Sequence, residues 1–408
     1  MPDPAKLELL TQTPGEVGFQ IVEIDSSRAF WAFKPQQLPS TEWQLTPQPV
    51  GADGARNYIL KNLRHDRYLL LNSKEHFLWN YFDGRHSLEE IARAFYLSVG
   101  AFDYSIIRQL LTKLYHCGLL EGSHAMDLQP SRPGAIDDRW TDRIGRRLMT
   151  WRRISLRISN ADRYCSIIYD RGGFLLFHPL AFWLSTAIAI LALALAVRLT
   201  PNARDFTYFV TARPFLITSA MLATLLVASM LHVLVHALAC KSYGRRVREM
   251  GFFLLQGVWP TFYADVTDIF MSSRRARVTV DLAGPMVEVV LGSVAILGAH
   301  ASNPGIGQAL LFGAGVMLWE SAVINLYPFN FLEMDGYNIL SDSLAMPMLR
   351  QQALALIPNL PRRLRSMRTI DRAEWIQIGY LMLCLVSVLV YLIAHLDAIG
   401  ALYPFSWQ

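Results

Sequence analysis

Five long apolar runs in the second half of the chain constrain its fold more than any other feature. About 20 consecutive helical residues cross the hydrocarbon core of a bilayer, and each run is close to that length. Of the 408 residues, 52% are hydrophobic and only 17% are charged, which is too apolar for an ordinary soluble protein. We therefore predict a mainly α-helical, polytopic membrane protein with five spans, near residues 180–197, 215–239, 278–299, 306–326 and 375–396.

Arginines between the runs predict the orientation of these helices. They concentrate before the first span, between the second and third, and between the fourth and fifth. Because cytoplasmic loops collect Lys and Arg, we expect the N-terminus in the cytoplasm and the C-terminus outside it. The first residues, MPDPAKLELL, lack the basic and apolar regions of a signal peptide. Membrane orientation thus explains the net charge of +5 better than nucleic-acid binding does.

A change of composition near residue 130 divides the chain into a soluble-looking half and a membrane half. The four cysteines show no paired spacing, so no disulfide framework is expected in either half. We predict a partly strand-like extension at 1–54, a folded domain at 55–125, a linker and basic juxtamembrane segment at 126–174, a membrane core at 175–400 and an extracytoplasmic tail at 401–408.

The soluble half has the pattern of a small winged-helix domain. Alternating apolar residues around a polar turn in segment 57–72 predict a hairpin, and Ser73 is positioned to cap the helix that follows. Ser87 and Glu90 form the S-x-x-E capping box of a second helix. A third apolar helical pattern and a short strand near residue 119 complete the α+β layout.

Segment 55–122 resembles PqqD-like peptide-recognition domains. The resemblance implies binding of a precursor or leader peptide, usually as a strand added to a sheet edge. A winged helix can also serve as a scaffold or as a DNA reader. Arg85, Arg93 and Arg108 make only a thin basic surface, and the attachment to a membrane argues against nucleic acid as a partner.

Two histidines lie four residues apart at the end of the second span, in the segment LHVLVHALACK. His232 and His236 therefore share one helix face about one turn apart, which suits two nitrogen ligands of a zinc ion. Asp335 follows the fourth span at the same predicted depth and on the same side. Two histidines and one carboxylate leave one zinc position open, as in catalytic sites. The alternative is a pair of polar residues at the inner membrane boundary.

The block 229–342 resembles the site-2 protease class of intramembrane zinc metalloproteases, and within it a bacterial branch of peptide zinc metalloproteases. The matching pieces, in family order, are LHVLVHALACKSYG, MGFFLLQGVWPTFYADVTD, AGPMVE and an N…P…DGY segment that ends in SD. This resemblance implies a site-2-protease-like helical core in which His232, His236 and Asp335 bind one zinc ion.

The same resemblance implies where substrate binds. The stretch 251–263, which begins with Gly251 and Phe252, would be a membrane-inserted hairpin that pairs with an extended substrate. Asn325 would help to hold the substrate or the loop backbone.

Val233 departs from the family, which has its general-base glutamate at this position. Losing a positioned base typically costs about 10²–10⁴-fold in rate, although zinc alone still lowers the pKa of a water molecule. The candidates to replace the base are Glu333, Glu288 in AGPMVE and Glu320 in the fourth span. Each has a structural alternative, namely interhelical hydrogen bonds for Glu288 and Glu320, and a loop position for Glu333.

The sequence therefore leaves three functions open. An active protein would cut a peptide bond by attack of zinc-activated water, during maturation or export of a ribosomally made peptide. A pseudoprotease would bind peptides as a chaperone or as a partner of an active enzyme, and a transporter-like protein would use its histidines structurally. The expected partners are a precursor peptide, export machinery and the lipid bilayer of a bacterial inner membrane.

Overall fold

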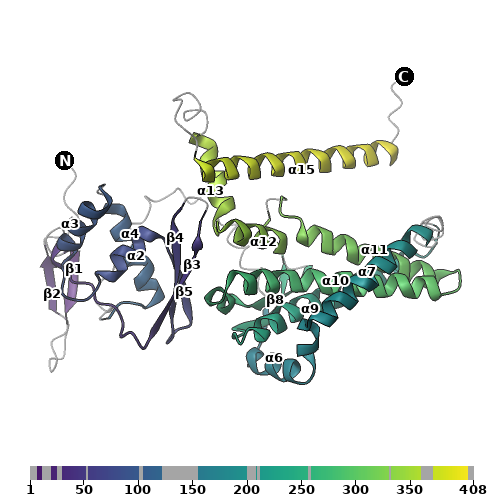
Figure 1. Ribbon diagram of the computed structural model, residues 1–408, viewed down its shortest axis with the longest axis horizontal. Helices are drawn as coiled ribbons and strands as arrows, with labels where there is room; N and C mark the ends of the chain where they lie inside the picture. Colours follow the sequence, from purple (N-terminus) through teal and green to yellow (C-terminus); the bar gives the residue numbers. More distant parts are fainter. Residues whose placement is uncertain are drawn as a thin grey trace. The chain divides into compact units, whose positions relative to one another are not determined.

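The computed structural model divides into two compact units, Met1–Arg139 and Trp140–Gln408 (Figure 1). Residues 126–154 of the predicted linker and juxtamembrane segment, and most of the predicted tail, lie outside the residues that the structure describes. The described residues are 7–11, 20–24, 30–51, 54–100, 104–121, 155–199, 208, 212–255, 259–329, 332–359 and 371–402.

A three-stranded antiparallel sheet belongs to the first unit. Its two later strands form the predicted hairpin. The first strand lies before the expected domain start at residue 55 but pairs with the second, so the sheet includes part of the N-terminal segment. The strands, in spatial order, are β3 (Trp43–Val50), β4 (Arg56–Asn62) and β5 (Arg67–Leu71). A separate antiparallel pair is formed by β1 (Leu7–Thr11) and β2 (Gln20–Ile24).

Capping boxes start the first two helices of this unit. The predicted box of Ser87 and Glu90 is present, with each residue bonding the backbone of the other. The first helix is capped one residue earlier than expected, because Asn72 rather than Ser73 accepts the backbone N–H of Glu75. The helices are α2 (Ser73–Asn80), α3 (Leu88–Val99) and α4 (Tyr104–Cys117).

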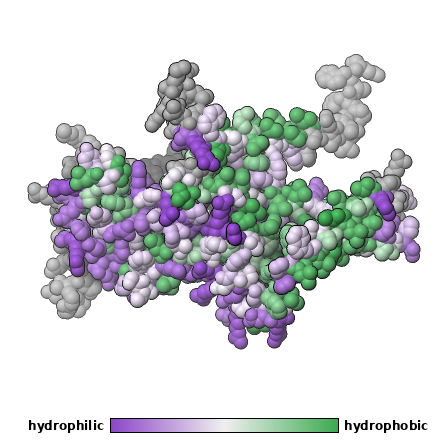
Figure 2. Space-filling view, viewed as in Figure 1, coloured by the Kyte–Doolittle hydropathy of each residue, from purple (hydrophilic) through white to green (hydrophobic). Residues whose placement is uncertain are grey.

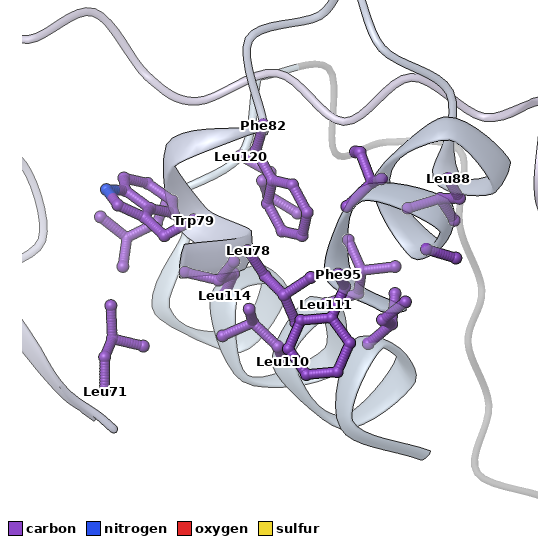
Figure 3. Close-up of a cluster of buried hydrophobic side chains, with 14 of the residues drawn as sticks. Leu71, Leu78, Trp79, Phe82, Leu88, Phe95, Leu110, Leu111, Leu114 and Leu120 are labelled. Carbon is purple, nitrogen blue, oxygen red and sulfur yellow. The ribbon is translucent and has the colours of Figure 1, made fainter. Parts of the chain in front are cut away.

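The apolar faces of these helices enclose one core with the sheet. Figure 3 shows labelled side chains from α2, α3 and α4 pointing toward one another, with Leu71 from β5 and Leu120 after α4. Trp79, Phe82 and Phe95 are the largest fully buried members, and burying each contributes roughly 1.5–3 kcal/mol or more. Helical periodicity in the sequence thus identifies most of this core.

The second unit is mostly helical and contains five helices that are long and apolar enough to cross a membrane, within the described residues. This fits the predicted multi-pass membrane protein. Apolar residues cover much of the surface along the long helices (Figure 2). The five are α7 (Pro179–Leu199), α9 (Pro214–Ser242), α10 (Arg274–Ala301), α11 (Ile306–Leu326) and α15 (Arg372–Leu402).

Shorter elements connect these helices. The stretch that follows α9 forms a strand pair, as predicted, and a strand from before the first span joins it. The strands are β6 (Ser155–Ile158), β7 (Glu249–Leu255) and β8 (Trp259–Asp265), with β7 in the middle. The short helices are α6 (Ala161–Asp170), η1 (Gly173–Phe177), η3 (Thr267–Met271), α12 (Asp335–Leu344), α13 (Leu349–Leu356) and η4 (Ile357–Asn359).

Helix α10 is central to this unit, since it contacts α7, α9, α11 and α12 (Figure 1). Two glycines allow its close approach to α11: a Cβ added to Gly292 would lie 2.9 Å from the carbonyl oxygen of Gly315. The indole Nε1 of Trp319 on α11 donates to the Val289 carbonyl at 3.2 Å. Small residues at such crossings let membrane helices pack through their backbones, which fixes the position of α10.

The predicted orientation can be tested with reporters. Alkaline phosphatase fused after Gln408 should be active, and green fluorescent protein fused there should be dark, because five crossings from a cytoplasmic N-terminus end outside. Fusions after Asn359, between the fourth and fifth spans, should give the reverse result. The same reporter being active at both positions would contradict the predicted topology.

Candidate metal centre

Three side chains from two helices converge on one point. His232 and His236 lie on α9, and Asp335 is the first residue of α12. Each offers one donor atom, and the three atoms lie within 4.8 Å of one another. The Nε2 atoms are 2.9 Å apart, and they lie 3.2 and 3.5 Å from the two oxygens of Asp335. Tetrahedral ligands about 2.0–2.2 Å from a zinc ion are separated by about 3.3–3.6 Å. The two spacings to Asp335 are close to this range, and the two rings would separate by about 0.4 Å to share a single ion.

The other nitrogen of each ring is held by α10. The Nδ1 atom of His232 lies 2.9 Å from Glu288 Oε1, and that of His236 lies 2.6 Å from the Val280 carbonyl. Since both partners accept hydrogen bonds, each Nδ1 carries the proton and each Nε2 keeps a free lone pair. Such partners orient metal-binding histidines and raise their basicity. The rings are thus prepared for ligation through Nε2.

Asn325 extends this support to a third helix. Its Nδ2 on α11 lies 3.2 and 3.4 Å from the two carboxylate oxygens of Glu288. The side chain expected to hold substrate therefore bonds the carboxylate that holds His232. A chain of contacts runs from α11 through α10 to α9, and it fixes the ring of the first histidine.

Helix α12 places the third donor and is itself anchored. Arg277 on α10 pairs with Asp342 near the end of α12 at 2.9 Å, and both side chains are mostly buried. A Cβ on Gly336 would overlap the Leu326 backbone, so the start of α12 packs directly on the end of α11. The two oxygens of Asp335 therefore face the Nε2 atoms of His232 and His236, at 3.2 and 3.5 Å.

Gly284 lets the backbone of α10 pack directly against both histidine rings. A Cβ at this position would overlap the Nε2 atoms of both His232 and His236. Any side chain at 284 would therefore displace the two rings. Donor types, spacings and ring partners fit a divalent ion such as zinc. The AGPMVE segment contains this glycine, but its contact with the rings depends on how α9 and α10 cross, which the sequence alone does not show.

Among the described contacts, none of the three glutamates named as replacement bases touches an Nε2 atom of His232 or His236. Glu288 contacts Nδ1 of His232 and is therefore on the far side of that ring from Asp335. Glu333 is exposed, and its Oε1 pairs with Arg350 at 2.6 Å and accepts from the Gln351 amide at 2.8 Å. Glu320 is exposed on α11. Glu288 and Glu333 thus have the structural roles given as their alternatives, and Glu320 lies outside the cluster.

Gly251 and Phe252 lie on the middle strand of their sheet. Gly251 is opposite Arg157 of β6 on one side and opposite Tyr263 of β8 on the other. Both backbone edges of β7 are therefore occupied, and a substrate strand would have to add at β6 or β8. A Cβ on Gly251 would overlap the Leu156 carbonyl and the Tyr263 ring, so close packing explains this glycine.

The fold and this cluster define a helical membrane protein with a two-histidine, one-aspartate centre between its helices. In sequence it is similar to the "Putative peptide zinc metalloprotease protein YydH" of Bacillus subtilis (strain 168), with 30% identity over 112 residues. The match covers 27% of this chain and 42% of the relative, so it spans less than half of that protein. No family model matches the chain, and no solved structure matches it.

Replacing Gly284 with alanine should abolish ion binding while the helices stay folded. The added methyl group would clash with both Nε2 atoms and displace the rings, so we expect zinc affinity to fall by at least about 100-fold, the upper end of losses from changes outside the ligands themselves. Competition with a chromophoric chelator measures this in detergent. Gly298→Ala on the same helix is the matched control, because its Cβ would meet only Leu311, at 3.5 Å or more. Equal zinc affinity in the two variants would contradict this placement of the ion.

Proposed function

We propose that this chain is a membrane-embedded zinc metalloprotease-like protein of the site-2 protease class. One observation carries the proposal: two imidazoles and a carboxylate meet at ligand spacing, and α10 holds both rings with Nε2 free. The similarity to a peptide zinc metalloprotease supports the same class. The arginine distribution supports a cytoplasmic N-terminus, and the similarity to a Bacillus subtilis protein supports a bacterial inner (cytoplasmic) membrane as its location.

The residues around the centre have distinct tasks in this proposal. His232, His236 and Asp335 would hold the ion. A bound zinc supplies Lewis acidity, which polarises a peptide carbonyl and lowers the pKa of a water molecule. Glu288 keeps the His232 ring in its tautomer and orientation, and Asn325 keeps Glu288 in place. Apolar helices around the centre limit the access of bulk water, which strengthens electrostatic interactions within it.

An extended peptide would reach the centre along the sheet of the second unit. β8 is an edge strand of that sheet, and it contacts α9, which carries both histidines. Strand addition satisfies the backbone of an extended segment with hydrogen bonds. Strand addition would also pair the N–H and C=O groups of the peptide at membrane depth, where unpaired backbone groups are costly. We therefore assign substrate pairing to the outer edge of β8 rather than to β7.

The first unit would deliver the substrate. Its sheet has two outer strands, β3 and β5, to which a precursor or leader peptide could add. A binding module joined to a membrane core raises the local concentration of the peptide at that core. This arrangement suits maturation or export of a ribosomally made peptide, with export machinery as a further partner.

Val233 favours a second candidate, a pseudoprotease. Valine neither accepts nor donates a proton, so the position next to His232 cannot serve as the base. In this version the centre keeps its ion and binds an extended peptide without cutting it. The protein would then act as a chaperone or as a partner of an active enzyme or exporter.

Restoring glutamate at position 233 distinguishes the two functions. Wild type, His232→Ala and Val233→Glu would each be co-expressed with the small proteins encoded beside the gene, and the products identified by mass spectrometry. An active wild type should yield a cleavage product that is absent with His232→Ala. For a pseudoprotease, the product should appear only with Val233→Glu, with a gain of about 10²–10⁴-fold over wild type. If neither protein cuts, while both bind zinc, the protease function is wrong and peptide binding remains.

A further inference from the structure

Three charged residues and one glycine lie along one face of α10. Arg277, Asp281, Gly284 and Glu288 are separated by four, three and four residues, so they lie above one another on the helix. The contacts of three of them are described above. Gly284 abuts both Nε2 atoms, Glu288 bonds the His232 ring, and Arg277 pairs with Asp342 of α12.

Asp281 is the remaining member of this face, and it lies one turn from Gly284. It is half-buried, and it is close enough to Asp335, Asp342 and Arg277 to interact with their charges. Its carboxylate is therefore on the same side of α10 as the metal centre. It is not one of the three clustered donors, but it lies about one helical turn from Gly284, which abuts both Nε2 atoms.

Within the described part of the chain, this carboxylate has charged neighbours but makes no hydrogen bond and no ion pair, although Glu288, Asp335 and Asp342 each make at least one. Ionisable groups within membrane helices are costly and usually mark a functional site. The oxygens of Asp281 are therefore able to accept a proton.

We propose that Asp281 is the general base that replaces the missing glutamate at position 233. The inference rests on the proposed protease function and names the residue that moves the proton. Two of the three sequence-based candidates are already engaged, Glu288 by the His232 ring and Asn325, and Glu333 by Arg350 and Gln351. The third, Glu320, is exposed on α11. Asp281 lies one turn from Gly284 and is not so engaged.

The proton transfer balances without any further reactant. A carboxylate oxygen of Asp281 takes one proton from the attacking water while the water oxygen bonds to the scissile carbonyl carbon. When the carbon–nitrogen bond breaks, Asp281 gives the same proton to the leaving amine nitrogen. The second proton of the water leaves the new carboxyl group for the product amine. The products are therefore a carboxylate-ended and an ammonium-ended fragment, and Asp281 returns to its ionised form.

The test compares wild type, Asp281→Asn, Val233→Glu and the double variant on one probe, fluorescein-labelled casein, in detergent. Asp281→Asn should lower the cleavage rate by about 10²–10⁴-fold. It should weaken zinc binding, measured by chelator competition, by about 10-fold or less, since it removes no ligand. Adding Val233→Glu to Asp281→Asn should restore cleavage, because a second base then takes the proton. A structural role for Asp281 would not be rescued in this way.

Any of five results would overturn the inference. One is an unchanged rate with Asp281→Asn, and another is a parallel collapse of cleavage and zinc affinity. The third is that Glu333→Gln, rather than Asp281→Asn, stops cleavage. Cleavage by Val233→Glu but not by wild type would overturn the role of Asp281 alone. Failure of both proteins to cut the probe would overturn the proposed function, and this inference with it.

Discussion

The hydrogen bonds that α10 makes to the two histidine rings are the constraint on which the rest of the site depends. Glu288 and the Val280 carbonyl occupy both Nδ1 atoms, so both Nε2 atoms face the third donor. Gly284 on the same helix lets the backbone pack directly against both rings. Because one helix supplies all three features, a small shift of α10 would move both rings together. Packing on α11 and the ion pair with α12 oppose such a shift.

Local patterns in the sequence predict much of the fold, because hydropathy, periodicity and capping act over a few residues. The five long helices, the hairpin of the first unit and the Ser87 capping box follow from them. The approach of Asp335 to the histidines was predictable from its depth and side of the membrane. The Val280 carbonyl was not, since a backbone acceptor carries no signal of its own. Nor was the middle position of β7, because β6 comes from before the first span.

Ion binding and bond cleavage are separable in this site. Residue 233 is neither a donor nor a ring partner, so valine there affects the movement of a proton rather than the binding of the ion. A buried ligand set also needs its partners, since unpaired polar groups in hydrocarbon are costly. Asn325 and Glu288 meet that need for His232. The residues of the centre can therefore bind a metal ion on their own, whereas cleavage of a peptide bond depends on one further carboxylate.

X-ray absorption at the zinc edge tests the central claim most directly. The full chain, purified in detergent and loaded with one equivalent of zinc, should show only nitrogen and oxygen ligands at about 2.0–2.2 Å, two of them imidazoles. Cys240 lies one turn beyond His236 on α9 and is buried, so it is the obvious competing ligand. A sulfur ligand at about 2.3 Å, or no bound zinc at all, would contradict the two-histidine, one-aspartate centre.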